Sequence, residues 1–178
     1  MIKVELKGEA WKFKGARMKL TRSIMREVGD VAAEGNKNRL DRGLGVDESG
    51  QETRLVPLSA LTVGRKGSSI PLVDTGGMKD SFQVDSGKLT DTRVVIAFSP
   101  EQALKAAVHQ RGAVIQVRNA KALRIPVGPK RGAGKSGAAI FRKRAVIPAR
   151  PHVGPSTQDR EDIIDVLAAR MRTALKAS

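Results

Sequence analysis

The sequence contains no cysteine and no tyrosine, and aromatic residues make up only 3% of its 178 residues. Without cysteine the chain cannot form disulfides, thiolate metal sites or a cysteine nucleophile. Because aromatic side chains are so few, a hydrophobic core has to be built from Val, Ile, Leu, Ala and Met. The length suits a single domain over residues 1–178, with long excursions from its body.

Long apolar runs are missing as well. No stretch approaches the roughly 18 consecutive apolar residues that a membrane-spanning helix needs. The first residues, MIKVELKGEAWKFKG, carry charges throughout, which a secretory signal does not. We therefore expect no membrane partner.

Acidic residues are absent between Glu101 and Asp159, although Lys and Arg recur along the same stretch. The formal net charge of the whole chain is +15. A segment with one sign of charge repels itself in water. The pattern therefore predicts either a solvated basic arm or a segment that contacts nucleic acid or an acidic protein surface.

Hydrophobic periodicity predicts an α+β fold, with two long amphipathic helices against an antiparallel sheet. Alternation in IKVELKG indicates a half-buried strand, and helical spacing predicts a first helix over residues 15–40, closed by Gly43 and Gly45. The last helix is predicted to be capped by Ser156 or Thr157 and to carry acidic residues in its first turns, where the helix dipole favours them. The residues expected to be buried on the two helices are Leu20, Ile24, Val28, Ile163, Leu167 and Met171.

Between these helices the pattern is less regular. Residues 43–71 are polar and Gly-rich and are predicted to form a flexible loop, with a short helical turn in LVPLSALTVG. A short helix capped by Asp74 or Thr75 follows, and FQVDSGKLTDTRVVIAFS predicts a β-hairpin. A further helix is predicted between Ser99, as its cap, and Gly112. Its apolar face is expected to consist of Ala103, Leu104, Ala107 and Val108.

Two more strands are predicted in AVIQVRN and KALRIPVG, and AAIFRKRAVIPARP predicts an extended return. Together they make residues 111–150 an extended basic arm within the domain. Its cationic side chains are candidate assembly contacts: Arg124, Lys130, Arg131, Lys135, Arg142, Lys143, Arg144 and Arg150.

The stretch GPKRGAGKS is similar to a phosphate-binding loop of the form G-x-x-x-x-G-K-[ST], but the first glycine of that motif should stand where the chain has Pro129. The segment that follows is predicted to be extended, whereas the motif needs a helix there. His109 and His152 are the only histidines, and zinc would need carboxylates from other segments, so structural roles are favoured. We find no catalytic constellation and expect no catalytic residue, metal or cofactor.

Nucleic-acid binding stays open as a function. The basic stretch contains a single aromatic residue, Phe141, and so lacks the stacking platforms of proteins that bind single strands. A basic arm that contacts phosphates without reading sequence remains compatible with the pattern.

Four pieces stand in order along the chain, PLVDTGGMKDSF, KAAVHQRG, KALRIPVG and AVIPARPHVG, and an amphipathic helix follows them. This order resembles the phage virion morphogenesis family, also called tail completion proteins, over roughly residues 15–175. The chain has His152 where an apolar aromatic residue commonly follows the Arg-Pro of the family, which predicts weaker packing there. The residues that match the family pattern are Thr75, Gly76, Ser81, His109, Gln110, Gly112, Pro148, Arg150 and Pro151.

The resemblance implies a non-enzymatic structural protein of a Mu-like tailed phage. Such a protein would complete the tail, as a tail terminator or head–tail connector, and join it to the DNA-filled head. Its expected partners are copies of itself in a ring, expected to be a hexamer, the connector or adaptor and tail-tube proteins of the neck, and packaged DNA through non-specific contacts. It would assemble in the host cytoplasm and lie at the head–tail interface of the virion. The alternative is a basic nucleic-acid-binding protein that acts outside the particle.

Overall fold

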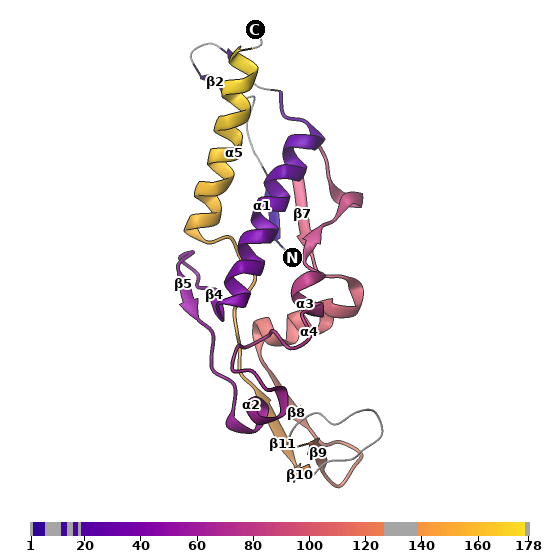
Figure 1. Ribbon diagram of the computed structural model, residues 1–178. Helices are drawn as coiled ribbons and strands as arrows, with labels where there is room; N and C mark the ends of the chain where they lie inside the picture. The colour runs from indigo at the N-terminus through magenta and orange to yellow at the C-terminus, as the bar shows by residue number, and fades with distance from the viewer. Residues whose placement is uncertain (1, 6–11, 14–15, 18, 127–138, 177–178) are drawn as a thin grey trace.

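Two long helices and a small antiparallel sheet form the body of an elongated molecule (Figure 1). The computed structural model describes all of the chain except residues 1, 6–11, 14–15, 18, 127–138 and 177–178. Helix α1 (Arg22–Asp41) lies between helix α5 (Thr157–Lys176) and the sheet. The sheet has the order β1 (Ile2–Glu5), β7 (Arg93–Ala97), β6 (Gln83–Val84), and neighbouring strands are antiparallel. This is the α+β architecture that the sequence predicted.

The other elements are shorter and lie between or beyond these. Three further helices are α2 (Ala60–Lys66), α3 (Gly77–Asp80) and α4 (Pro100–Arg111), and a 3-10 turn, η1, covers Ser86–Lys88. The paired short strands are β2 (Lys12–Phe13) with β3 (Ala16–Arg17), β4 (Leu44–Val46) with β5 (Glu52–Arg54), β8 (Ala113–Gln116) with β11 (Arg144–Ile147), and β9 (Leu123–Pro126) with β10 (Ala139–Arg142).

Helix α1 begins at Arg22 rather than near Gly15, because Thr21 caps it. The Thr21 hydroxyl accepts the backbone N–H of Ile24 at 3.4 Å, which satisfies one of the unpaired donors of the first turn. The helix ends where Gly43 adopts a left-handed φ of 70°, as predicted. Gly45 does not close the helix and lies in β4.

One core joins the sheet to both long helices. Gly29 of α1 lies so close to the sheet that a Cβ there would be 2.5 Å from Val94 and 2.7 Å from Val84. Val28, like Ile163 and Leu167 of α5, is buried as expected. Leu20, Ile24 and Met171 are partly buried against the same core. The buried core residues are Met25, Val28, Ala32, Ala33, Phe82, Val84, Leu89, Val94, Ile96, Ile163 and Leu167.

Residues 43–71, predicted to be a flexible loop, contain the β4–β5 hairpin and helix α2. The hairpin turn is organised by Asp47, whose Oδ1 accepts the backbone N–H groups of Ser49 and Gln51, both at 2.9 Å. Weak periodicity concealed this hairpin, because each of its strands is only three residues long.

The β6–β7 hairpin was predicted correctly, whereas the cap of α3 was not. The hairpin in FQVDSGKLTDTRVVIAFS is confirmed, with Gln83 opposite Ala97 and Val84 opposite Ile96. Helix α3 is present, but its N-cap is Gly76, at φ 83°, rather than Asp74 or Thr75.

Helix α4 has the predicted bounds but turns a different face to the core. Ser99 precedes Pro100 as the N-cap without a side-chain hydrogen bond, and Gly112 ends the helix. Ala106 is buried, whereas Leu104 is 75% exposed. The predicted face of Ala103, Leu104, Ala107 and Val108 was therefore wrong, since the small side chain of Ala106 is the one that meets the core.

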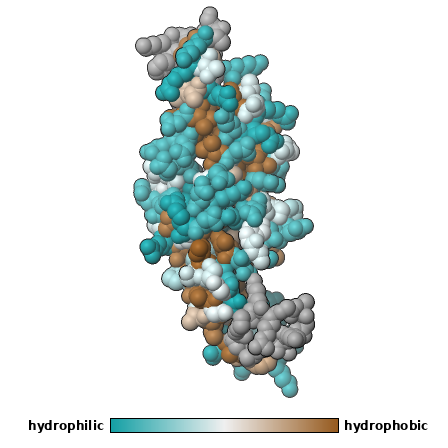
Figure 2. Space-filling model, in the orientation of Figure 1, coloured by the Kyte–Doolittle hydropathy of each residue, from teal (hydrophilic) through white to brown (hydrophobic). Residues whose placement is uncertain are grey.

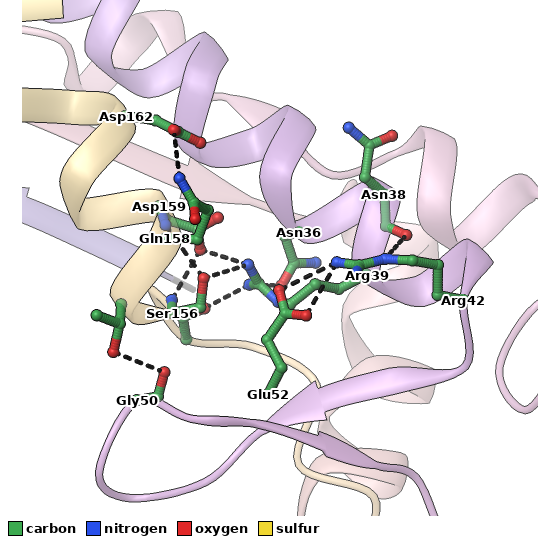
Figure 3. A network of polar contacts seen from close by, with 12 residues as sticks. Asn36, Asn38, Arg39, Arg42, Gly50, Glu52, Ser156, Gln158, Asp159 and Asp162 are labelled. Carbon is green, nitrogen blue, oxygen red and sulfur yellow. Dashed lines mark hydrogen bonds and ion pairs between the residues drawn. The ribbon is translucent and has the colours of Figure 1, made fainter. Parts of the chain in front are cut away.

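A buried ion pair joins α1 to the start of α5 (Figure 3). The Arg39 guanidinium pairs with the Asp159 carboxylate, and both side chains are buried. Arg39 also donates to the Ser156 hydroxyl at 3.2 Å, to Asn36 Oδ1 at 3.2 Å and to the Gly154 carbonyl at 2.7 Å. The guanidinium is thus held by one carboxylate and three neutral oxygens.

Asp159 and Ser156 also cap α5 reciprocally. The Ser156 N–H donates to Asp159 Oδ2 at 2.8 Å, and the Asp159 N–H donates to Ser156 Oγ at 3.1 Å. This is a capping box, which confirms Ser156 as the cap. Gly35 makes room for the arrangement, because a Cβ there would lie 2.1 Å from Asp159 Oδ1.

Truncating the buried face of α5 tests this packing. Leu167→Ala removes a buried side chain and should lower the free energy of unfolding by about 2–5 kcal/mol. Leu104→Ala, the same change at an exposed position, should stay within about 0.5 kcal/mol. Chemical denaturation of both variants measures the difference, and equal losses would contradict the burial assigned to α5.

Neutralising one partner of the buried pair tests its role. Asp159→Asn keeps the shape of the side chain but leaves the Arg39 cation buried without a counter-charge, so unfolding should become easier by about 3–5 kcal/mol. Glu27→Gln removes the carboxylate that Arg170 contacts at 2.8 Å between the same two helices, in a pair that is partly exposed. That control should cost about 0–1 kcal/mol. Similar losses in both variants would show that the Arg39–Asp159 pair is not a special constraint.

Candidate assembly surface

Strands β8 to β11 form a narrow ribbon that extends from the body at the end opposite the C-terminus of α5 (Figure 1). The two strands predicted in AVIQVRN and KALRIPVG are present as β8 and β9, but they belong to different two-stranded sheets. Each pairs instead with a strand of the return segment: Ala113 lies opposite Ile147 in β11, and Leu123 opposite Arg142 in β10. We call β8 to β11 the ribbon below.

The ribbon exposes apolar side chains. Val114 and Val146 lie directly opposite each other and are 50% and 62% exposed. Ile115 and Phe141 are also exposed. Figure 2 shows apolar surface in the part of the molecule where α2 and the ribbon lie. An isolated two-stranded ribbon is at best marginally stable in water, so exposed apolar residues on it favour a covering partner.

The candidate cationic residues fall into three groups: exposed residues, residues outside the described part of the chain, and one buried residue. Arg124, Arg142, Lys143 and Arg144 are exposed on the ribbon. Lys130, Arg131 and Lys135, and with them the GPKRGAGKS motif, lie outside the described residues. Arg150, predicted as an assembly contact of the arm, is buried in the body.

Arg150 fastens the return segment to the chain that precedes α2. Its Nε donates to the Val56 carbonyl at 2.8 Å and its Nη2 to the Pro57 carbonyl at 3.1 Å. Its backbone N–H donates to the His109 carbonyl at 2.7 Å. Burial lowers the pKa of this guanidinium. Arg150 therefore holds the base of the ribbon in this chain and is not part of its exposed surface.

The segments HQRG and IPARPHVG, far apart in sequence, meet at the base of the ribbon. The side-chain carbonyl of Gln110 accepts the backbone N–H groups of His152 at 2.9 Å and Val153 at 3.1 Å. Gly112, at φ 75°, lies so close to the return segment that a Cβ would be 2.8 Å from the Ala149 nitrogen. Pro148 and Pro151 flank these contacts, on either side of Ala149 and Arg150.

The motif residues near α3 separate into two groups. Thr75 and Gly76 line the same cavity as His109 and Arg150. Ser81 instead donates its hydroxyl to the Met78 carbonyl at 2.8 Å and lines a different groove, together with Gln110.

His152 packs well, contrary to the expectation of weaker packing. Its side chain is 1% exposed, its ring lies 5.9 Å from that of Phe98 between centroids, and its Nδ1–H donates to the Arg150 carbonyl at 2.8 Å. Burial lowers the pKa of His152. Burial and the neighbouring Arg150 charge lower the pKa of His109. Both rings are therefore neutral in the folded protein near pH 7.

An extended basic arm was predicted, but the exposure of apolar side chains on it was not. The sequence did contain a signal that strand β8 needs a cover on both faces. Ala113, Val114 and Ile115 are three consecutive apolar residues, which is typical of a strand covered on both faces and not of a half-exposed one.

The described residues contain no cluster of His, Cys, Asp or Glu suited to a metal ion. None of the helices in the described part of the chain is long and apolar enough to cross a membrane.

The buried histidines predict an acid-sensitive fold. Their pKa values lie below the ordinary 6.5, so the unfolded chain binds more protons than the folded chain once the pH falls below about that value. The free energy of unfolding should be highest above pH 6.5. As the pH is lowered below that value, it should fall by at most about 1.4 kcal/mol per pH unit for each ring that titrates. Denaturation of wild type and His152→Phe between pH 7.5 and 5 measures this, and the variant should show the shallower fall. Identical slopes would exclude His152 as a source of the sensitivity.

Comparison with known proteins identifies the family. The chain matches the phage virion morphogenesis family over residues 10–172, a range that includes α1, α4, the ribbon and most of α5. Comparison with curated proteins and with solved structures gave no match. The family is a structural one and not a class of enzymes. Because the match extends over most of its length, the chain belongs to the phage virion morphogenesis family.

Proposed function

We propose that this protein completes the phage tail and joins it to the DNA-filled head, as a homo-oligomeric ring at the neck in which the ribbon acts as an assembly arm. The family match supports a role in phage structure and assembly. The observation that carries the finer proposal is the ribbon itself, which is free of acidic residues, extends from the body and exposes Val114 and Val146.

The charge distribution favours a second copy of the chain as the partner of the ribbon. Every acidic residue lies outside residues 102–158. Five exposed acidic residues lie on the long helices, Asp30, Glu34 and Asp41 on α1 and Glu161 and Asp165 on α5. In Figure 1, α5 and α1 lie in the upper part and the middle of the elongated molecule, and the ribbon extends away from them at its lower end. One chain therefore cannot bring its own ribbon onto its own acidic helices, whereas a neighbouring chain can.

A contact between the ribbon of one copy and the body of the next is head-to-tail. Such contacts generate a ring when the rotation between copies closes. Each exposed ion pair contributes only about 0–1 kcal/mol. Burial of Val114 and Val146 adds a hydrophobic contribution at every interface, and repetition around the ring multiplies both. We propose a hexamer, with the connector or adaptor and the tail tube above and below it.

Charge reversal on the ribbon tests this function. Arg142→Glu with Arg144→Glu should leave the melting temperature nearly unchanged, because both residues are exposed. In a phage complementation assay the double variant should nevertheless accumulate separate heads and tails, since its ribbon is repelled by acidic helices. The matched control is Lys19→Glu with Arg54→Glu, the same charge change at exposed positions of the body, and it should give normal particles.

Two results would contradict the proposal. The first is a normal yield of infectious particles from the ribbon double variant. The second is a protein absent from purified particles that binds DNA with a salt-dependent affinity lost in the same variant, which would favour the basic nucleic-acid-binding protein.

A further inference from the structure

A cavity of about 370 Å³ lies beside the base of the ribbon and takes its walls from α2, residues 72–78 and α4. It is open to solvent and is separate from the exposed surface of the ribbon. Its lining residues include the cations Arg65, Lys66, Lys105 and Arg150, the acidic residue Asp74, and the apolar residues Leu58, Leu72 and Met78. Cations thus outnumber acidic residues on its wall.

The Arg150 guanidinium is the unusual member of this set. It is 5% exposed, and its hydrogen bonds are made to the neutral carbonyls of Val56 and Pro57. Among the residues that the structure describes, no carboxylate forms an ion pair with it. A buried cation is costly without an opposite charge. Arg39, which is also buried, has the counter-charge of Asp159.

Two further cations reinforce the positive field at the wall, and the neutral ring of His109 lies beside them. Arg65 of α2 and Lys105 of α4 are exposed and both line the cavity. His109 Nδ1 is buried and has no hydrogen-bond partner among the described residues. Cations that line a concave, partly apolar surface focus the potential and attract anions.

The apolar part of the wall indicates which kind of anion fits. Leu72, which lines the cavity, has a φ of 64°, which is uncommon for a residue other than glycine and indicates local backbone strain. Leu58 and Met78 extend this apolar wall. A glutamate side chain would place its methylene groups there and its planar carboxylate against the guanidinium fork, a geometry that arginine binds well. A nucleic-acid backbone offers phosphates but no apolar group for this wall.

We propose that the cavity binds a carboxylate from an acidic polypeptide segment, a glutamate next to an apolar residue, supplied by a neighbouring protein. The incoming carboxylate gives Arg150 the counter-charge that the described residues of this chain lack. Arg65 and Lys105 attract it, and its neighbouring apolar residue packs on Leu72. The site does not depend on the proposed role of the ribbon, because its residues lie apart from Arg142 and Arg144.

The test uses the full-length protein and an acetylated, amidated Leu-Glu-Leu-Glu peptide as the probe, with calorimetry and NMR as readouts. The peptide should bind saturably, and the Leu-Gln-Leu-Gln peptide should bind at least about 10-fold more weakly, because it lacks the charge. Arg65→Gln with Lys105→Gln should weaken binding by at least about 10-fold without lowering the melting temperature, since both residues are exposed. Arg118→Gln with Lys121→Gln removes the same charge outside the cavity and should bind as wild type does.

Four outcomes would overturn the proposal: no binding of the charged peptide at millimolar concentration, equal binding of the Gln peptide, equal loss in both double variants, or displacement of the peptide by a 12-nucleotide DNA strand that itself needs Arg65 and Lys105. The ribbon variant Arg142→Glu with Arg144→Glu should keep full peptide affinity. A failure of the ring function and a failure of this site are thereby distinguished.

Discussion

The buried ion pair between Arg39 and Asp159 is the constraint on which the rest of the structure depends. The pair fixes the start of α5 against the end of α1. Arg39 Nη2 also donates a hydrogen bond to the Gly154 carbonyl. From there the chain runs back through Val153 and His152, whose N–H groups are held by Gln110 of α4. A continuous set of polar contacts therefore links the helical body to the base of the ribbon. A ribbon that joins subunits has to be anchored in this way if it is to transmit force to its own body.

Arg39 and Arg150 are the two buried arginines in the described part of the chain, and their charges are compensated differently. Arg39 has a carboxylate, a hydroxyl and two carbonyl oxygens around it, so its charge is compensated inside the chain. Arg150 has two carbonyls, and within the described residues it has no carboxylate. The first arrangement completes the fold of one subunit. The second leaves an uncompensated positive charge at a cavity wall, which suits a protein whose neighbours supply the counter-charge on assembly.

Helix caps and turns could be predicted from the sequence, because they depend on residues that are close together in the chain. The Ser156 cap of α5, the glycine that ends α4 and the hairpin of β6 with β7 each depend on residues close together in sequence, and all were predicted. The reciprocal bond from the Ser156 N–H to Asp159, which completes the capping box, was not predicted. The exposed face of α4 was not predicted, because Leu104 and Ala106 fit equally well on a helix until its tertiary neighbours are known.

Contacts over long sequence separations could not be predicted from one sequence. Arg39 and Asp159 are 120 positions apart, and Asp159 had a sufficient local explanation in the helix dipole. The pairing of β8 with β11 instead of β9 also joins distant segments. Arg150 was assigned to the exposed arm because charge patterning places a residue in a segment but does not show which side of a fold it faces. The family resemblance, in contrast, rested on ordered motifs, and two of them, HQRG and IPARPHVG, meet in space at the ribbon base.

Electron microscopy of assembled phage necks would test the central claim most directly. The account predicts a closed ring of copies of this chain between head and tail, with each ribbon lying on α1 and α5 of the adjacent copy and Val114 and Val146 covered. A ring in which the ribbons leave the acidic helices bare, or a neck that lacks this protein, would contradict it.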